Sequence, residues 1–225
     1  MVGSRILARI GIQAAFTDAA DGGVRDAADP LAERIAWRAG FHLPLHQCRQ
    51  LHGDAVWWVE WGDAGDGADI LISRKRHHTL AIRTADCLPV LLADGEAGVV
   101  AAVHAGWRGT VCNVVARAVA VMVEIGARAE RIHADFGPAI GPCCFRVEGE
   151  ARARLQAAAD GVGVTAADGA AAYADLAAIN RWQLERAGVP AGQIDSDGPC
   201  TCCSGGYFSH RRDRSPWRQL SLISA

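Results

Sequence analysis

Short apolar runs bounded by turn-forming residues dominate the first two thirds of the chain, and they predict β-strands. These runs cover residues 55–61, 70–73, 80–83, 89–93, 99–104 and 132–136. Helical spacing of apolar residues appears instead in 30–40, 110–126, 149–159 and 175–187. In the clearest helix, Thr110 is the predicted N-cap and Gly126 ends the apolar pattern. Because the two kinds of element alternate along the chain, they predict a mixed α and β fold.

The chain is predicted to form a single domain over residues 1–225. It has 225 residues, of which 50% are hydrophobic and 21% charged, enough to bury a core without disulfides or metals. Two stretches rich in Ala, Gly and Asp, at 17–29 and 160–172, are interpreted as surface connections. The apolar pattern continues across both of them, so neither is taken as a domain linker.

Charge and hydropathy narrow the classes of partner. No apolar run reaches the roughly 18 to 20 residues needed to cross a bilayer. The formal net charge of −2, from 23 basic and 25 acidic residues, gives no electrostatic signature of nucleic-acid or anionic-membrane binding. The first 16 residues lack the continuous apolar segment and cleavage site of a signal peptide. We therefore expect a cytoplasmic protein, a monomer or homodimer, with a small-molecule substrate.

Cysteine usage points to thiol chemistry rather than to disulfides. The chain has 8 cysteines, and four of them form the vicinal pairs Cys143-Cys144 and Cys202-Cys203, which can bond to each other only with strain. Reduced thiols then serve as metal ligands or nucleophiles. A zinc ribbon that includes Cys200 is disfavoured, because adjacent cysteines cannot mimic a Cys-x-x-Cys knuckle.

Polar and reactive residues are concentrated in five segments, four at predicted strand ends and Gly-rich turns and a fifth near residue 200. Gly-rich turns allow a backbone to approach a ligand closely. The segments are Gln-Leu-His-Gly at 50–53, Thr-Ala-Asp-Cys-Leu-Pro at 84–89, Val-His-Ala-Gly-Trp-Arg-Gly-Thr at 103–110, Gly-Pro-Ala-Ile-Gly-Pro-Cys-Cys at 137–144, and 200–213.

His52, Cys87 and His104 are each placed at the end of a predicted strand, so they are candidates to converge. Two imidazoles and one thiolate suit Zn²⁺, and three protein ligands leave a fourth position open for water or substrate. Copper accepts the same ligands. The same residues also suit a hydrolase in which Cys87 is the nucleophile and His104 its base. The spacing does not separate these interpretations, nor does it exclude a buried structural Cys87.

The strand-to-helix connection after His104 is a candidate anion site. Arg108 and a helix N-terminus would face the end of the strand and receive a phosphate, with Gly106 allowing close approach. A structural ion pair for Arg108 fits equally well. Trp107 is a candidate surface for purine stacking, and Gly137 and Ser209 are expected to line the same pocket.

The five segments resemble, in order, the motifs of the YfiH or laccase-domain family, also labelled multicopper polyphenol oxidases and associated with purine nucleoside phosphorylase activity. The matched motifs span residues 50–213 and end in Cys-Thr-x-Cys and Phe-Ser-x-Arg-Arg-Asp. The resemblance implies an α+β fold with mixed, β-sandwich-like sheets flanked by helices, related to cysteine hydrolases. It also implies one zinc ion bound by His52, Cys87 and His104, with copper as the alternative.

The resemblance implies several activities: phosphorolysis of adenosine, inosine and methylthioadenosine, deamination of adenosine, copper-dependent phenol oxidation, and cleavage of peptidoglycan precursors. Three departures stand out. Phe16-Thr-Asp lacks the arginine that follows Phe-Ser-x in the family, so one cationic contact is expected to be missing. His210 replaces the usual tyrosine, and Ser215-Pro-Trp-Arg218 replaces the Gly-Arg pair that follows Arg-Arg-Asp in the family.

The leading hypothesis from the sequence is a zinc-dependent purine nucleoside phosphorylase that also deaminates adenosine. Arg108 would bind phosphate, and Asp86 would carry the proton in deamination. A Cys-His amidase is the alternative. A copper phenol oxidase ranks third, because the remaining histidines show no His-x-His pattern to supply further copper ligands. A binding protein without turnover is the non-enzymatic alternative.

Overall fold

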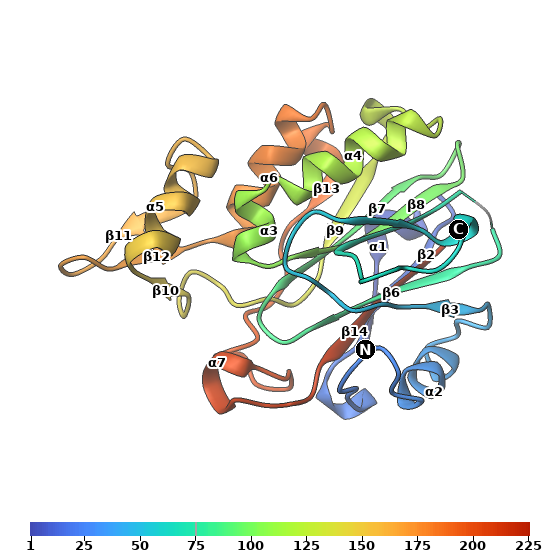
Figure 1. Ribbon diagram of the computed structural model, residues 1–225, viewed down its shortest axis with the longest axis horizontal. Coiled ribbons are helices and arrows are strands. Elements are labelled where there is room, and N and C mark those ends of the chain that lie inside the picture. Colours follow the sequence, from blue (N-terminus) through green and yellow to red (C-terminus); the bar gives the residue numbers. More distant parts are fainter. Residues whose placement is uncertain (75) are drawn as a thin grey trace.

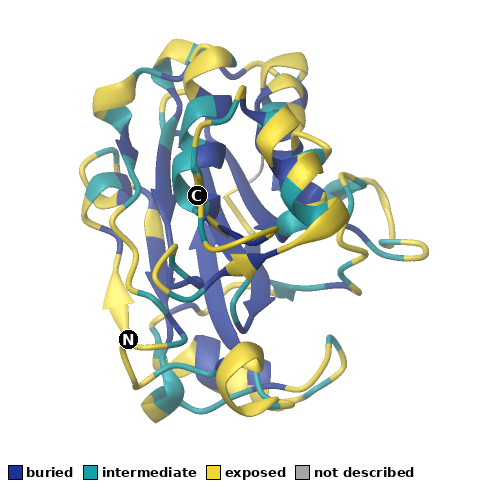
Figure 2. Ribbon diagram, turned by 90° about the vertical axis from the view of Figure 1, so that its left-hand side faces the viewer, coloured by how far each residue is buried: buried dark blue, intermediate teal, exposed yellow. Residues whose placement is uncertain are grey.

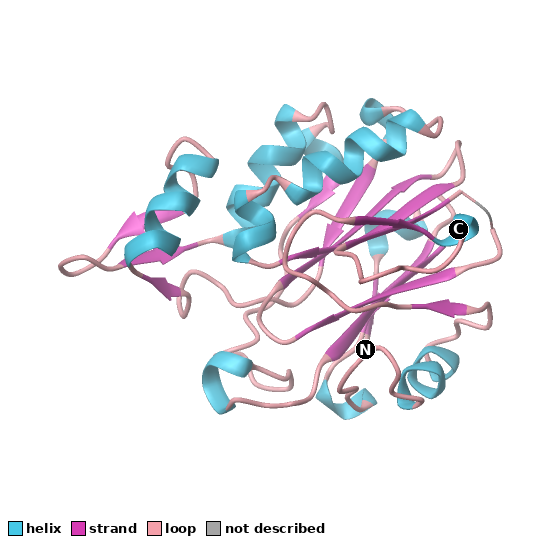
Figure 3. Cartoon of the chain, viewed as in Figure 1, coloured by secondary structure: helices cyan, strands magenta, loops and turns pink. Residues whose placement is uncertain are grey.

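Two mixed β-sheets pack face to face, and helices cover their outer faces (Figures 1 and 3). The computed structural model describes residues 1–74 and 76–225. The five-stranded sheet has the order β1 (Val2–Gly3), β2 (Gln13–Phe16), β14 (Gln219–Ser224), β6 (Thr79–Thr84) and β3 (Leu45–His46). The six-stranded sheet has the order β13 (Ile194–Asp195), β9 (His133–Phe136), β7 (Leu88–Asp94), β8 (Val99–Ala105), β5 (Ile70–Ser73) and β4 (Val56–Trp58).

Helices form the outer layers. The helices α3 (Trp107–Val111), α4 (Val114–Glu124) and α6 (Leu176–Arg186) lie on the side of the six-stranded sheet, and α2 (Leu31–Arg38) packs on the five-stranded sheet. A small sheet of β10 (Arg146–Val147), β12 (Ala172–Ala174) and β11 (Val164–Ala166) accompanies α5 (Gly149–Ala158) at one side of the molecule (Figure 1). The short α1 (Arg5–Ala8) and α7 (His210–Asp213) complete the α-helices of the described residues.

The central strands are buried on both faces, as the dark interior of Figure 2 shows. In β7, Val90 and Leu92 pack with the helical layer, whereas Leu91 and Ala93 pack against the five-stranded sheet. This alternation follows from the two-residue period of a strand. It explains why β7 and β8 appear in the sequence as continuous apolar runs rather than as alternating ones.

The predicted α+β class with mixed, sandwich-like sheets is confirmed. All six predicted strands are present, although the first is shorter than predicted, because 55–61 forms β4 and then a 3-10 helix over Val59–Trp61. The strands β2 and β14 were not predicted. Among the described residues, no helix is long and apolar enough to span a membrane.

The helix predicted over 110–126 requires a correction. It is two helices, because Asn113 adopts a left-handed backbone conformation with φ 60° and interrupts the hydrogen-bonding pattern between α3 and α4. Thr110 is therefore not an N-cap. It lies inside α3, where its Oγ1 accepts a hydrogen bond from Asn180 Nδ2 at 2.9 Å and joins α3 to α6.

Candidate metal centre

The ligand atoms of His52, Cys87 and His104 lie within 4.8 Å of one another. The hairpin register brings the two strand-borne groups together, because β7 pairs antiparallel to β8 with Pro89 opposite His104. Cys87, one residue before β7, therefore lies beside the end of β8. The three residues predicted to converge do so in the structure.

His52 reaches the centre from the loop before β4, which a single buried carboxylate holds in place. The Asp69 oxygens accept backbone hydrogen bonds from Leu51, His52 and Gly53 at 3.1, 2.9 and 2.8 Å. His52 itself adopts a left-handed conformation with φ 62°, which is unfavourable for a non-glycine residue. The hydrogen bonds to Asp69 offset the cost of this conformation. The loop is thus fixed before any ligand binds.

The same carboxylate orients His104. Asp69 Oδ1 lies 2.7 Å from His104 Nδ1, and both side chains are buried, with exposed fractions of 0% and 2%. Since Nδ1 is taken, Nε2 is the ring nitrogen left for Cys87 or a metal. Burial alone would raise the pKa of Asp69, but the His104 and backbone hydrogen bonds lower it overall.

Sequence reasoning missed Asp69. The available signal was an acidic residue directly before the buried strand β5, a position where a carboxylate persists only if it is fully hydrogen-bonded.

Cys87 is held as a thiolate by its neighbours. Burial would raise the pKa of its thiol, but the charges and hydrogen bonds of His104 and His52 outweigh burial and lower this pKa to about 6. The pKa of His104 moves the other way, to about 9, because Cys87 and Asp69 outweigh the opposing effect of burial. A thiolate beside an imidazole is the starting arrangement for both metal binding and nucleophilic attack.

The donor set fits a borderline-soft divalent metal. Two imidazoles and a thiolate are typical ligands of zinc, and a carboxylate behind one imidazole is the usual supporting group. Gly106 closes one side of the centre: a Cβ there would lie 3.1 Å from Cys87 Sγ and 3.3 Å from His52 Cδ2. The close approach of this backbone leaves no room for a side chain on that side of the centre.

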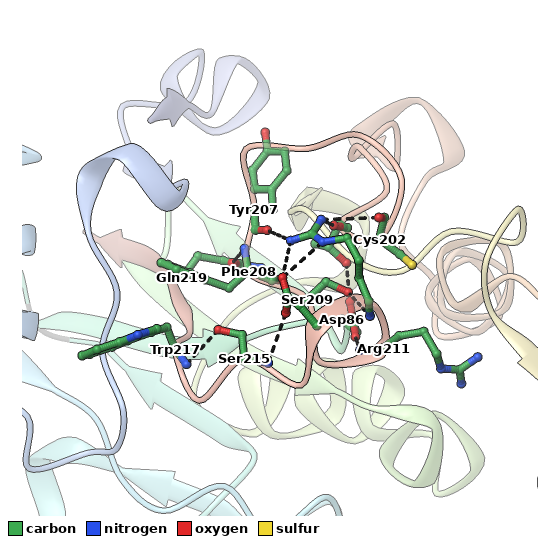
Figure 4. Close-up of polar contacts among 12 residues, drawn as sticks. Asp86, Cys202, Tyr207, Phe208, Ser209, Arg211, Ser215, Trp217 and Gln219 are labelled. Atoms are coloured by element: carbon green, nitrogen blue, oxygen red, sulfur yellow. Dashed lines mark hydrogen bonds and ion pairs between the residues drawn. The ribbon is translucent and has the colours of Figure 1, made fainter.

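Asp86 joins the centre to the C-terminal segment (Figure 4). Its Oδ1 accepts a hydrogen bond from Thr201 Oγ1 at 2.7 Å, and its Oδ2 accepts one from the Arg211 backbone N–H at 2.6 Å. Asp86 has a positive φ of 93°, which is rare for a non-glycine residue. The two hydrogen bonds hold the residue before Cys87 in this conformation.

A cavity of about 740 Å³ opens over the three metal-binding candidates. Its wall includes all three of them together with Asp86, His210 and Phe145. Five arginines also line it: Arg25, Arg49, Arg83, Arg211 and Arg218. Arg83 is tied to the wall by hydrogen bonds to Gln47 Oε1 and the Cys48 carbonyl at 3.1 and 2.8 Å.

The arginines make this cavity suitable for an anion. Within residues 1–74 and 76–225, none of the five forms an ion pair with a carboxylate. Guanidinium groups without a carboxylate partner bind phosphate by charge-assisted hydrogen bonds. The N-terminal segment contributes Arg25 to this wall.

The other predicted site residues lie in different places. Gly106 contacts the centre, but Arg108 is exposed and stacks on Trp107, with its guanidinium carbon 4.5 Å from the ring centre. Neither Arg108 nor Trp107 lines the cavity, and Trp107 packs partly against the core. The helix that begins there is only five residues long, so phosphate binding is better assigned to the cavity arginines.

Gly137 and Ser209 are also outside the lining of this cavity. A Cβ at Gly137 would collide with the Phe16 ring, and the glycine lines a smaller cavity of about 240 Å³ beside Asp135. Ser209 is fully buried and accepts a hydrogen bond from the Arg212 backbone N–H, as the N-cap of α7. Both residues therefore support the backbone around the site.

The model of the family described as multi-copper polyphenol oxidoreductase laccase matches residues 21–225. The chain belongs to this family. Two curated relatives are named purine nucleoside phosphorylase. One, from Deinococcus radiodurans, is 41% identical over 82% of this chain and 72% of its own length. The other, from Mycobacterium tuberculosis, is 38% identical over 88% of this chain and 80% of its own.

Another member of the family has a different name. A protein of an unknown prokaryotic organism, named adenosine deaminase RL5, is 38% identical over 65% of this chain and 58% of its own length. Among solved structures, YlmD from Geobacillus stearothermophilus has a TM-score of 0.85 and 28% identity, covering 98% of this chain and 93% of that one. The Bacillus licheniformis protein YfiH has a TM-score of 0.81 and 26% identity, covering 95% and 92%.

Proposed function

We propose that this chain is a zinc-dependent purine nucleoside phosphorylase that also deaminates adenosine in the same cavity. One observation carries the proposal: the centre formed by His52, Cys87 and His104 opens into a cavity whose arginines have no carboxylate partners in the described chain. The arginine-lined wall suits the phosphate of phosphorolysis, and the metal-binding set suits the water that attacks C6 in deamination. The names of the curated relatives agree with this pair of activities.

In phosphorolysis, the arginines would hold phosphate near C1′ of the ribose. A phosphate oxygen attacks C1′ as the bond from C1′ to N9 breaks, and the purine leaves with the bonding electrons and takes up a proton. Arg25 and Arg49 are exposed at the cavity and are the groups we assign to phosphate. The products are the free base and ribose 1-phosphate.

In deamination, water replaces the amino group at C6 of adenine and ammonia leaves. Zinc, when bound to the two histidines and Cys87, supplies the Lewis acidity that lowers the pKa of water to roughly 7. Asp69 keeps His104 oriented through Nδ1. Asp86 lines the cavity next to Cys87, and its carboxylate, positioned by Thr201 and Arg211, is the group we assign to proton transfer.

Product analysis tests the proposal. Metal-quantified protein is incubated with adenosine, inosine and methylthioadenosine, with and without phosphate, and the products are identified by mass spectrometry. Free base and ribose 1-phosphate that form only with phosphate support phosphorolysis, and inosine from adenosine without phosphate supports deamination. The variants Cys87→Ser and His104→Ala should lose the metal bound at this centre and both activities, whereas Cys112→Ser, which alters an exposed thiol elsewhere, should retain them. Full activity in His104→Ala would contradict the proposal.

A second candidate function is favoured by the order of the three groups Cys87, His104 and Asp69. A thiolate, an imidazole and a buried carboxylate in hydrogen-bonding sequence form the arrangement of a cysteine hydrolase. Such an enzyme would attack an amide carbonyl, for example that of a peptidoglycan precursor. Amide cleavage by chelator-treated protein, blocked by alkylation of Cys87, would favour this function over the zinc enzyme.

A further inference from the structure

Four cysteines outside the centre come together from two turns. The sulfur atoms of Cys143, Cys144, Cys200 and Cys203 all lie within 4.8 Å of one another, and those of Cys143 and Cys203 are 3.5 Å apart. Four sulfurs that bind zinc at about 2.3 Å in a tetrahedron are about 3.8 Å apart. The arrangement therefore requires only small side-chain movements to enclose a zinc ion.

Cys143 and Cys144 are adjacent in the sequence, which argued against a zinc site, but a tight turn lets both of them contribute a sulfur. The backbone N–H groups of Cys144 and Phe145 both donate to the Gly141 carbonyl, at 3.0 and 2.9 Å. This turn brings both sulfurs within reach of the second turn, in which the Ser204 N–H donates to the Cys200 carbonyl at 3.0 Å. The four ligands therefore come from two separate turns, of which only the second, with Cys200 and Cys203, has Cys-x-x-Cys spacing.

The two turns are fastened to each other by backbone contacts. Ala139 pairs with Cys200 in an isolated β-bridge, and the Thr201 N–H donates to the Ala139 carbonyl at 2.9 Å. The Gly141 N–H donates to Cys200 Sγ at 3.2 Å, the kind of hydrogen bond that supports a thiolate ligand. The positions of the sulfurs are thus set by the fold.

Gly141 makes room for the cluster. A Cβ at this position would lie 3.3 Å from Cys200 Cβ and 3.5 Å from Cys143 Sγ. Any larger residue would push the two turns apart. The glycine therefore allows the sulfurs of the two turns to approach each other.

We propose that Cys143, Cys144, Cys200 and Cys203 form a second, structural zinc site. Four protein ligands leave no open position, which is typical of a zinc ion that stabilises a fold. The site would fasten the C-terminal segment beside the candidate centre, because Thr201 and Arg211 in that segment hold Asp86. This inference does not depend on the reaction proposed above.

Metal counting by plasma mass spectrometry tests the second site directly. Protein expressed with zinc and freed of loosely bound metal should contain about two zinc ions per chain, and Cys203→Ser about one. Cys203 is exposed, so its replacement leaves no buried void, and Cys143→Ser repeats the test at another exposed ligand. Cys112→Ser, at an exposed cysteine outside the cluster, should keep the full content.

The variant His104→Ala isolates the second site from the first. Its remaining zinc should show only sulfur ligands, at about 2.3 Å, in X-ray absorption spectra. A His104→Ala protein without zinc, or with nitrogen and oxygen ligands around it, would overturn the proposal. So would a zinc-free cluster in which mass spectrometry finds a Cys143–Cys203 disulfide, the other bond that the 3.5 Å sulfur separation allows.

Hydrogen exchange reports the structural role without reference to activity. If zinc fastens the turns, amides of 200–213 should exchange at least about tenfold faster in Cys203→Ser than in the unaltered protein, because local opening becomes easier. The Cys112→Ser protein should match the unaltered one. Equal exchange in 200–213 for all three proteins would show that the cluster holds no stabilising ion.

Discussion

Asp69 Oδ1 lies 2.7 Å from His104 Nδ1 and 2.9 Å from the backbone nitrogen of His52, so one buried oxygen positions two of the three candidate metal ligands. The other oxygen of the same carboxylate accepts the N–H groups of Leu51 and Gly53. The centre is therefore organised by a residue that does not itself coordinate the metal. A binding site fixed in this way loses little entropy when the ion binds.

Asp69→Asn should weaken zinc binding by about 10- to 100-fold. In the unaltered protein, the backbone N–H groups of Leu51 and Gly53 both donate to Asp69 Oδ2. The asparagine amide keeps one acceptor oxygen but places an NH₂ group, which cannot accept, opposite these two donors. Competition with a chromophoric chelator measures the dissociation constant. Asp66→Asn, at an exposed position three residues earlier, is the matched control and should bind as the unaltered protein does. Equal affinity in Asp69→Asn would refute this role for the carboxylate.

Gly106→Ala should reduce zinc content even though the backbone there suits alanine. Gly106 has φ −69° and ψ 171°, so the substitution adds no backbone strain, and the only change is a methyl group 3.1 Å from Cys87 Sγ. The methyl group displaces the thiolate or His52. Zinc counting compares this variant with Gly192→Ala, where no atom lies within 4 Å of the added methyl. Unchanged zinc content would mean that the centre has more room than its geometry indicates.

Arg49→Met should raise the KM for phosphate about tenfold, equivalent to about 1.4 kcal/mol, with a smaller effect on the KM for the nucleoside. The exposed guanidinium of Arg49 lines the cavity without a carboxylate partner in the described chain. Phosphorolysis kinetics at varied phosphate measure the change. Arg117→Met removes an exposed arginine from α4 and is the control. If Arg108→Met raised the KM for phosphate more than Arg49→Met did, phosphate would bind at the strand-to-helix turn rather than at Arg49.

Cys87 in metal-free protein should react with iodoacetamide at unusually low pH. A lowered pKa means that the thiolate predominates above about 6, so reactivity rises through about pH 6 and is lost below it. In His104→Ala the midpoint should move up toward the ordinary thiol value of 9.0, because the largest group favouring the thiolate is gone. Alkylation rates of the Cys87 peptide by mass spectrometry give both midpoints. If the unaltered protein and His104→Ala had the same midpoint, His104 would not be the group that lowers the pKa of Cys87.

The sequence predicted the two strands that carry the centre because their buried faces leave continuous apolar runs. It also predicted the convergence of Cys87 and His104, since the start of one hairpin strand lies beside the end of the next. The capture of His52 by Asp69 spans 17 residues and leaves no periodic signal. The arginine-rich wall was equally hidden, because its members come from segments as distant as Arg25 and Arg218.

Two failures have local physical causes. A single left-handed residue, Asn113, divides a helix whose apolar pattern continues without a break. The convergence of the four cysteines was missed because Cys143 and Cys144 are adjacent and do not form a Cys-x-x-Cys pair to match Cys200 and Cys203, which lie about 60 residues further along the chain. In both cases a backbone turn, rather than the side-chain pattern, determines the structure.

The position of β14 between β2 and β6 has a consequence for how the protein is made. Of these three strands the ribosome releases β2 first and β6 second, and the strand that joins them, with Ser221 opposite both Phe16 and Ile82, is released last. The five-stranded sheet therefore cannot close until β14 has left the ribosome. Until it does, the apolar face of β7 that this sheet covers is exposed, and the nascent protein at that stage is a natural client for chaperones.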